Sequence, residues 1–201
     1  MPTVYDFKPR FQGLLRPISD RLARAGITAN QVTVAALLLS AVGGGALLWE
    51  VSRPIGLLAL PLVLLVRMAL NAIDGMLARE HGQQSSLGAV LNELGDVLSD
   101  IMLYLPFAVL AGAPAALVVG VVLAALLVEM TGVVGVQIGA GRRYEGPVGK
   151  SDRAVLFGGV GLLLGVGVMP GAWLTWLMAL AFVLSLVTVV NRVRAALREV
   201  A

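Results

Sequence analysis

The sequence predicts an all-α integral membrane protein with six transmembrane helices and an N-terminal amphipathic surface helix. Of its 201 residues, 58% are hydrophobic and only 13% are charged, and the mean hydropathy is +0.90. A soluble globular domain is about half apolar and a quarter charged, so this composition indicates a membrane protein. Six apolar stretches, each long enough or nearly long enough to cross a bilayer, give the number of helices.

The six stretches are separated by short breaks containing Gly, Pro or Ser, which are typical of turns. They cover about 30–49, 55–78, 87–110, 114–138, 154–169 and 172–192. We expect a single domain over residues 1–201, with a juxtamembrane segment at 1–28, a six-helix bundle at 30–192 and a tail at 193–201. The chain has no cysteine, which excludes disulfides and thiol-based metal sites.

The positions of the basic residues test this topology. Thirteen of the 15 Lys and Arg residues fall in the N-terminal segment, the second and fourth loops, or the tail, whereas Arg53 lies in another loop and Arg67 lies within a helix. By the positive-inside rule, both termini and the even-numbered loops face the cytoplasm. No small-residue cleavage site follows the first stretch, so we expect no removed signal peptide. The expected location is the cell inner (cytoplasmic) membrane.

Before the first stretch, apolar residues recur at helical spacing among basic ones: Phe7, Phe11, Leu14, Leu15, Ile18, Leu22 and Ala25. This pattern predicts an amphipathic helix on the cytoplasmic membrane surface. Because Gly13 and Pro17 interrupt it, we expect two short pieces with a bend. A loosely ordered basic tail is the alternative.

Polar side chains collect on one face of the second and third helices. At three- and four-residue steps the second helix carries Arg67, Asn71, Asp74 and Ala78, and the third carries Gly88, Asn92, Asp96, Asp100 and Tyr104. A short loop joins the two helices, so we expect antiparallel neighbours whose polar faces form a cup open to the cytoplasm. Ionisable groups within membrane spans usually mark a functional site.

The chemistry of this cup predicts a metal site. Its oxygen ligands suit a hard divalent cation, Mg²⁺ or Mn²⁺, and Mg²⁺ usually keeps positions open for water or substrate phosphates. We therefore expect a substrate that carries phosphate. The alternative is structural, in which Arg67 and Glu129 pair with the acids and hold the helices together.

The spacing of these residues resembles a known family signature. From Asp74 the chain reads Asp-Gly-x2-Ala-Arg, then eight residues, then Gly88, with Asn92 and Asp96 at four-residue steps. Over 26 residues this resembles the CDP-alcohol phosphotransferase (CDP-alcohol phosphatidyltransferase) pattern D-x2-D-G-x2-A-R-x8-G-x3-D-x3-D. The stretches ITANQVT (27–33), with Ala29 where proline is usual, and GPVGKSDRA (146–154) are similar to the family's entry to the first helix and its polar fourth loop.

The resemblance implies a reaction and a role for each matched position. An alcohol hydroxyl attacks the lipid-linked phosphate of a CDP-linked lipid such as CDP-diacylglycerol, and CMP leaves. By position, Asp74 and Asp96 are metal ligands, and Asp96 is also the general base. The residues that would line the cytidine and pyrophosphate pocket are Gly75, Ala78, Arg79 and Gly88.

Two positions depart from the pattern, because Asn71 and Asn92 stand where the family has Asp. An amide oxygen still ligates a hard cation, but each replacement removes one negative charge. Asp100, one turn beyond Asp96, would restore one charge if the cup extends inward. We expect a variant site with weaker or fewer metals, one ion or two, and with candidate ligands Asn71, Asp74, Asn92, Asp96 and Asp100.

The fourth loop carries four candidate acceptor-binding residues: Arg142, Arg143, Lys150 and Arg153. Arginine forks and lysine point charges are what a phosphate monoester needs. They favour a phosphorylated alcohol, such as glycerol-3-phosphate or an inositol phosphate, as the acceptor. The same charges would also satisfy the positive-inside bias and bind anionic lipid headgroups.

The expected partners are a CDP-linked lipid, a small alcohol and membrane lipids, with no nucleic acid. Gly161 and Gly165 form a GxxxG motif that fits either a homodimer contact or close packing within one chain. Two other functional classes stay open. The two asparagines would suit a non-catalytic lipid- or nucleotide-binding relative, and intramembrane charge would suit a transporter or channel, although no internal repeat is visible.

Overall fold

The computed structural model describes residues 8–49 and 53–201, and within them it contains seven α-helices, one 3₁₀ turn and no strand. Phe7, used in the prediction of the amphipathic helix, lies outside the described residues. The elements are α1 (Lys8–Arg24), α2 (Ala29–Leu48), α3 (Arg53–Glu80), α4 (Ser86–Tyr104), η2 (Leu105–Val109), α5 (Ala115–Gln137), α6 (Lys150–Gly165) and α7 (Ala172–Val200).

The predicted all-α membrane protein is confirmed. Four helices, α2, α3, α5 and α7, are long and apolar enough to cross a bilayer by length and composition. The other two expected spans differ for simple reasons: α4 has 19 residues but carries three carboxylates, and α6 has only 16 residues. Polar content and shortness therefore mark the two helices that carry half of the charged residues of the cluster described below.

Local sequence signals set where the helices begin and end. At the start of α2, the Thr28 hydroxyl accepts the N–H of Gln31, and the Gln31 side chain accepts the N–H of Thr28, a capping box that satisfies two otherwise unpaired donors. Ser85 caps α4 by accepting the N–H of Gly88. Pro106 lacks an N–H to continue the helix, and α4 gives way to η2 there.

Helix α1 runs unbroken from Lys8 to Arg24 across Gly13 and Pro17, where we expected two pieces. The hydrogen bond lost at Pro17 is the one to the carbonyl of Gly13, and glycine gives that carbonyl freedom to turn away from the proline ring. Arg16 holds Glu80 through two hydrogen bonds of 2.9 and 3.0 Å. These bonds fix α1 to the end of α3.

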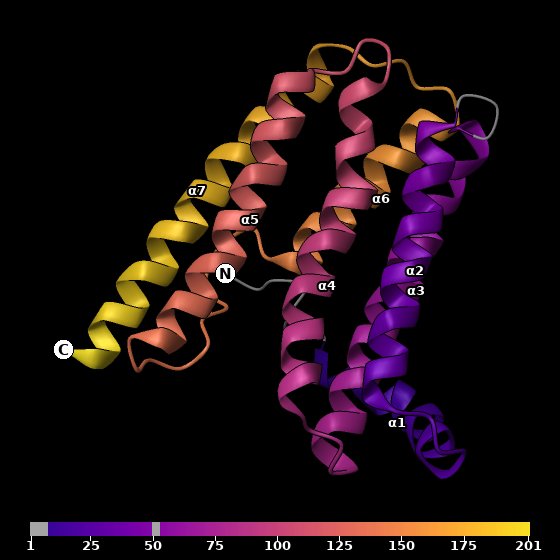
Figure 1. Ribbon diagram of the computed structural model, residues 1–201. Helices are drawn as coiled ribbons and strands as arrows, with labels where there is room; N and C mark the ends of the chain where they lie inside the picture. The colour runs from indigo at the N-terminus through magenta and orange to yellow at the C-terminus, as the bar shows by residue number, and fades with distance from the viewer. Residues whose placement is uncertain (1–7, 50–52) are drawn as a thin grey trace.

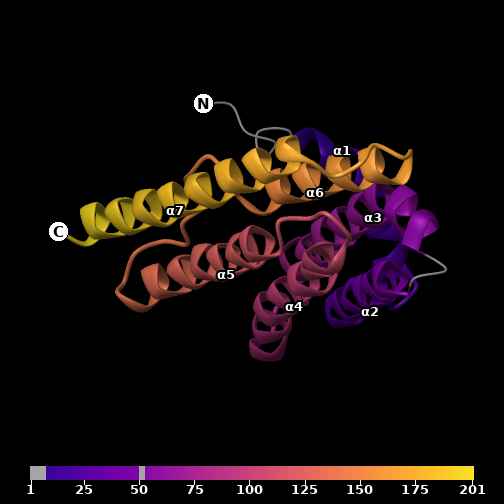
Figure 2. The ribbon, with the colours of Figure 1, turned by 90° about the horizontal axis from the view of Figure 1, so that it is seen from above.

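Helices α2–α7 pack as two groups (Figures 1 and 2). One group joins α3 to α2 and α6, and α2 to α4; the other is the α5–α7 pair, which meets the first group through α4 and η2. Tyr104 and Phe107 stack on and edge against Phe157 of α6, with ring centroids 4.2 and 5.2 Å apart. These rings fill the core between the groups.

Glycines permit the closest helix crossings. A Cβ at Gly44 of α2 would lie 2.1 Å from the carbonyl oxygen of Met102 in α4. At the predicted GxxxG, a Cβ on Gly161 would lie 2.9 Å from Leu60, and one on Gly165 would lie 2.9 Å from Leu58, both in α3. The motif therefore packs α6 against α3 within one chain.

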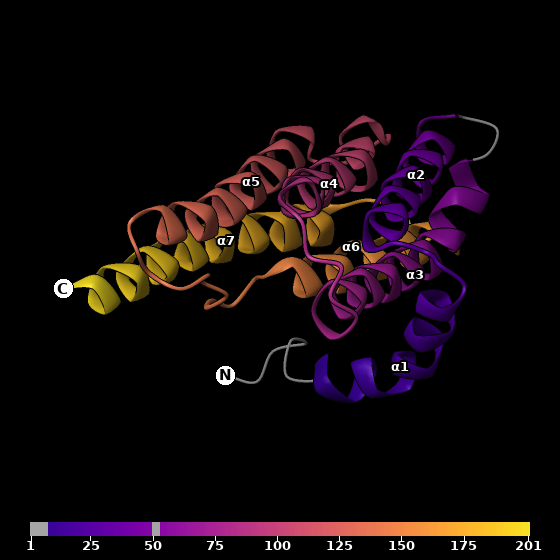
Figure 3. The same cartoon turned by 60° about the horizontal axis from the view of Figure 1, so that its bottom comes forward.

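Helix α1, the turn between α3 and α4, and the C-terminal end of α7 all lie at the same end of the molecule (Figures 1 and 3). The loop after α5 lies at this end too, since Gly141 donates its N–H to Glu199 near the end of α7. These are the segments that carry most of the basic residues.

Candidate active site

The polar faces of α3 and α4 meet. Asn71 in α3 donates its side-chain N–H to Asp96 Oδ1 in α4 at 2.9 Å. Arg67, one turn earlier in α3, donates to the main-chain oxygen of Asp96 at 3.0 Å. Asp74, one turn later, is 5% exposed and lies within electrostatic range of Asp96 and Lys150. The carboxylates of the two helices thus share one site.

Helix α2 holds the Asp74 carboxylate in place. The hydroxyl of Thr33 lies 2.8 Å from Asp74 Oδ2 and donates to it; the carbonyl of Ala29, at 3.1 Å, is the other acceptor in range. Thr33 stands in the stretch ITANQVT, but the sequence reasoning did not give it a site role. Its contact with Asp74 places the start of α2 beside the acids.

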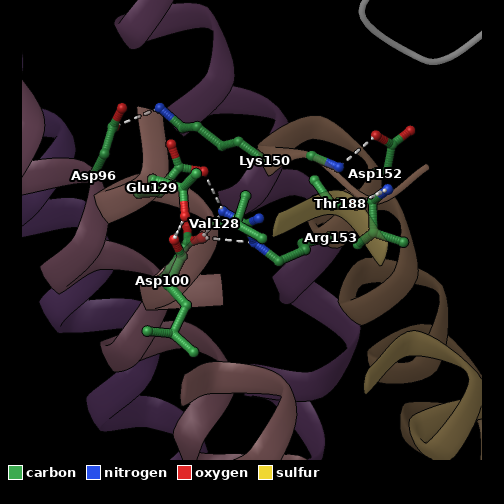
Figure 4. A network of polar contacts seen from close by, with 12 residues as sticks. Asp96, Asp100, Val128, Glu129, Lys150, Asp152, Arg153 and Thr188 are labelled. Carbon is green, nitrogen blue, oxygen red and sulfur yellow. Dashed lines mark hydrogen bonds and ion pairs between the residues drawn. The ribbon is translucent and has the colours of Figure 1, made fainter. Parts of the chain in front are cut away.

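Lys150 brings a positive charge to the same carboxylate. Its ammonium contacts Asp96 Oδ1, the oxygen that Asn71 also contacts (Figure 4). Lys150 is the first residue of α6, which is capped because Asp152 accepts the N–H of Gly149 at 2.9 Å. The start of a helix therefore fixes the backbone of Lys150, and the contact with Asp96 places its ammonium.

The loop before α6 is fastened to α7. Val148 donates its N–H to the Thr188 hydroxyl at 3.1 Å. Gly146 has a φ of +131°, and a Cβ there would lie 2.4 Å from a methyl carbon of Thr188. Only glycine combines this backbone angle with so close an approach.

Deeper in the bundle, Asp100 is enclosed by two guanidinium groups. Arg67 donates to Asp100 Oδ1 at 2.6 Å, and Arg153 of α6 donates to Asp100 Oδ2 at 2.9 and 3.1 Å. The side chains of Arg67 and Arg153 are each 1% exposed. Both oxygens of Asp100 are occupied, so Asp100 ties α3, α4 and α6 together and offers no free ligand oxygen in this arrangement.

Glu129, an acid in the apolar helix α5, pairs with three arginines from later segments, of which Figure 4 shows Arg153. Arg153 donates to its Oε1 at 3.0 Å, Arg142 approaches Oε2 at 3.4 Å, and Arg192 of α7 approaches Oε2 at 3.7 Å. Glu129 therefore pairs with basic residues and not with acids. The sequence signal for a role of Glu129 is that it is a lone acid in an apolar helix. Arg192 carries no such signal, because it looks like any other basic residue of a cytoplasmic tail.

Charges in the cluster balance. Its carboxylates are Asp74, Glu93, Asp96, Asp100 and Glu129, and its cations are Arg67, Arg142, Lys150, Arg153 and Arg192. We expected an anionic cup from α3 and α4 alone. The difference arises because the fourth loop, α6 and α7 fold back onto these helices and neutralise the acids.

The four predicted acceptor-binding residues separate into different surroundings. Lys150 contacts Asp96, and Arg142 pairs with Glu93 at 2.8 Å; their side chains are 26% and 21% exposed. Arg153 is buried with Asp100. Arg143 instead pairs with Glu199 and Glu145, near the end of α7.

The predicted nucleotide-pocket residues lie around the turn between α3 and α4. A Cβ on Gly75 would lie 2.8 Å from the guanidinium of Arg79, and one on Gly88 would lie 2.8 Å from Asn30 Oδ1. Bare backbone at these glycines leaves room for polar side chains. Arg79 is exposed, and Ala78 packs against the small core under α1.

The donor set of this site consists of oxygen ligands. Asn71 contacts the Asp96 carboxylate, Asp74 lies one turn after Asn71 in α3, and Asn92 lies one turn before Asp96 in α4. All four side chains offer oxygen ligands of the kind Mg²⁺ and Mn²⁺ take. Among the described residues, no three His, Cys, Asp or Glu side chains gather as a metal site. An ion here would therefore rely on amide and substrate oxygens to complete its shell.

This membrane-embedded fold and oxygen-rich site define a class, and sequence comparison identifies it. A model of the CDP-alcohol phosphatidyltransferase family matches residues 26–194, and the chain belongs to this family. The resemblance drawn from the sequence is thereby confirmed. The family's name describes the predicted activity, transfer of a substituted phosphate from a CDP-linked donor to an alcohol.

Several individual proteins are similar to this chain. The inner membrane protein YnbA of Escherichia coli is 49% identical over 198 residues, covering 97% of this chain and 96% of YnbA. The archaetidylinositol phosphate synthase of Pyrococcus horikoshii is 34% identical over 93 residues, or 46% of this chain and 47% of that protein. YnbA supports an integral, multi-pass protein of the inner membrane.

Two solved structures share the fold. The Mycobacterium tuberculosis phosphatidylinositol phosphate synthase PgsA1 with CDP-DAG bound has a TM-score of 0.74 at 22% identity, covering 90% of this chain and 92% of that one. The same enzyme in complex with manganese and citrate has a TM-score of 0.73 at 23% identity, covering 91% of this chain and 88% of that one.

Proposed function

We propose that this protein is a metal-dependent CDP-alcohol phosphotransferase of phospholipid synthesis. It would transfer a phosphatidyl group from a CDP-linked lipid to the hydroxyl of an alcohol and release CMP. The observation that carries the proposal is the meeting of Asn71, Asp74 and Asp96 in one site, within a chain of this family. CDP-DAG bound to PgsA1 supports CDP-diacylglycerol as the donor.

A Mg²⁺ or Mn²⁺ ion held by Asn71, Asp74, Asn92 and Asp96 would supply charge neutralisation for the diphosphate of the donor. The manganese complex of PgsA1 supports this choice of metal. The protein's own residues would position the ligands and bind the donor. Thr33 holds the Asp74 carboxylate in place, and the pocket around Gly75, Arg79, Ala78 and Gly88 would receive the cytidine and pyrophosphate.

Asp96 is proposed as the general base. Asn71 and Lys150 both contact its Oδ1, which leaves Oδ2 to accept the proton of the acceptor hydroxyl. The hydroxyl oxygen forms a new bond to the lipid-linked phosphorus, and the bond from that phosphorus to the diphosphate bridging oxygen breaks. CMP leaves with the bonding electrons.

We propose a phosphorylated alcohol, such as glycerol-3-phosphate or an inositol phosphate, as the acceptor. Two similar proteins are named as an archaetidylinositol phosphate synthase and a phosphatidylinositol phosphate synthase, and both names are consistent with a phosphorylated acceptor. Arg142 and Lys150 are the partly exposed cations beside Asp96 and Glu93, with Arg153 buried behind them. Arg143 pairs elsewhere, so we give it no direct contact with the acceptor.

We further propose that all six helices α2–α7 cross the inner membrane, with both termini in the cytoplasm and α1 on the membrane surface. Leu14, 77% exposed on α1, would enter the lipid. We also propose that residues 1–201 form a single domain and that the protein forms a homodimer.

The central experiment measures CMP release by the purified protein from CDP-diacylglycerol, with Mg²⁺ or Mn²⁺ and a panel of alcohol phosphates. We expect Asp96→Ala to lower the rate roughly 10²–10⁴-fold. Asp20→Ala, which alters a carboxylate of α1 paired with His81, is the matched control. Equal rates for Asp96→Ala and the native protein would refute the proposed role.

A second candidate is a non-catalytic lipid- or nucleotide-binding relative, favoured by Asn71 and Asn92. It predicts CDP-diacylglycerol binding without CMP release under any metal or acceptor. The same assay, combined with binding of labelled CDP-diacylglycerol, separates the two candidates.

A further inference from the structure

We propose that the Lys150 ammonium is a built-in cation that replaces one metal ion at Asp96, so that the site binds a single divalent ion. This inference rests on the proposed metal-dependent function. It concerns a property that the family pattern does not give, because the arrangement combines Lys150 with two asparagines at positions 71 and 92.

The first observation is the occupancy of Asp96 Oδ1. Two N–H donors, from the Lys150 ammonium and the Asn71 amide, point at this one oxygen. A carboxylate at position 71 would offer oxygens to a cation, whereas the Asn71 amide turns its positive N–H end toward Asp96. Two adjacent metal ions would lie about 3.5–4 Å apart and would share the oxygens of Asp96, one of which is here turned toward two nitrogen donors.

The second observation is charge. Asp74 and Asp96 carry two negative charges, and Lys150 supplies one positive charge at the same place. One divalent ion then brings the set to +1, which the diphosphate of a donor lipid compensates. A second ion would raise it to +3 in a partly buried site, where unbalanced charge is costly. Four aspartates without the lysine contact would instead balance two ions.

The third observation is that the backbone of Lys150 is held in place. It begins α6, the Gly149–Asp152 cap fixes that start, and Val148 anchors the preceding loop to Thr188. Its side chain spans from α6 to α4 across 54 residues of sequence. An ammonium has three N–H donors, so contact with Asp96 leaves two for an acceptor phosphate, and the two roles are compatible.

The test counts Mn²⁺ ions bound by the purified protein with CDP-diacylglycerol present, using electron paramagnetic resonance of free Mn²⁺. We expect one ion per chain for the native protein. The triple variant Asn71→Asp, Asn92→Asp, Lys150→Met should bind two. Lys150→Met alone should tighten the first ion roughly tenfold, since it removes a like charge beside the metal, and Lys150→Arg should leave the affinity near the native value.

Arg194→Met is the matched control, because it removes one exposed positive charge from α7 and should leave both number and affinity unchanged. Two ions in the native protein, or an unchanged affinity in Lys150→Met, would overturn this inference while leaving the proposed activity intact. No Mn²⁺ binding at all would overturn the metal-dependent function itself. Thermal melting of each variant, compared with that of the native protein, identifies any loss of fold.

Discussion

Asp74 is a carboxylate placed almost out of reach of solvent, with 5% of its surface exposed. Burying such a group without partners is costly, so its surroundings decide whether it can serve as a ligand. The Thr33 hydroxyl at 2.8 Å satisfies Oδ2 and fixes the direction of the carboxylate. A residue of the preceding helix therefore sets the geometry of a candidate ligand.

We expect Thr33→Val, which keeps the shape and removes the hydroxyl, to lower the kcat/KM for CMP release roughly tenfold. The free energy of unfolding should fall by about 1–2 kcal/mol, because a buried acceptor loses its donor. Thr33→Ser keeps the hydroxyl and should stay near native in both measurements. Equal activity of the Val and Ser variants would remove Thr33 from the site.

Arg153 illustrates how a buried charge acts as structure. Its guanidinium serves both Asp100 and Glu129. Removing one member of a buried pair leaves its partners as uncompensated charges, so Arg153→Met should lower the free energy of unfolding by about 3–5 kcal/mol. Thermal denaturation in detergent measures this. Arg143→Met, whose partners are the more exposed Glu145 and Glu199, should shift the melting far less.

For the acceptor, Arg142→Gln separates binding from stability. Because Arg142 is partly exposed beside Glu93, we expect it to raise the KM for the alcohol phosphate at least about tenfold, through loss of a charge-assisted hydrogen bond. The KM for CDP-diacylglycerol should change little. A larger effect on the lipid than on the alcohol would place Arg142 at the donor.

Among the elements, α2 and α4 make the tightest crossing. Gly44 faces the Met102 carbonyl so closely that a methyl group would lie 2.1 Å from it, whereas Gly45, the next residue, has nothing within 4 Å. Backbone cannot move aside as a flexible side chain can. The crossing therefore depends on one glycine in a run of three.

Gly44→Ala and Gly45→Ala form a matched pair. We expect Gly44→Ala to force the helices apart and destabilise the protein by about 1–3 kcal/mol, with a visible loss of melting temperature. Gly45→Ala should be neutral or stabilising by up to about 1 kcal/mol, because alanine favours helix. Equal melting temperatures for the two variants would contradict the crossing described.

The helices, and the way α3 and α4 face each other, could be predicted from the sequence because both follow from periodicity within one element. Asn71, Asp74, Asn92 and Asp96 share helix faces at three- and four-residue steps, and a short turn forces these faces together. The family signature covers the same stretch. These local rules needed no knowledge of the rest of the chain.

Contacts between distant segments could not be predicted in this way. The return of Lys150 to Asp96 depends on how the loop after α5 folds, and that depends on Gly146 and Val148 seating against Thr188. No periodicity encodes such a contact. Consequently the charge of the cup was expected to be negative, and the part played by Glu129 as an arginine partner was missed.

For the molecule as a whole, the proposed orientation has a direct test, since the chain contains no cysteine. Gln84→Cys lies in the exposed turn between α3 and α4, and Ala111→Cys lies in the exposed turn between η2 and α5. We expect a membrane-impermeant maleimide to label Ala111→Cys in intact cells and Gln84→Cys only after lysis. The reverse pattern would invert the proposed topology.

The order of the charged partners along the chain bears on how the protein enters the membrane during synthesis. Arg67 and Asp100 lie 33 residues apart on helices joined by a short turn, so α3 and α4 can partition as a hairpin with that charge already matched. Glu129 emerges from the ribosome before Arg142, Arg153 and Arg192. The charge of Glu129 can be matched only after those arginines have been made. We therefore expect the insertion of α5 to depend on completion of the chain more than the insertion of the α3–α4 hairpin does.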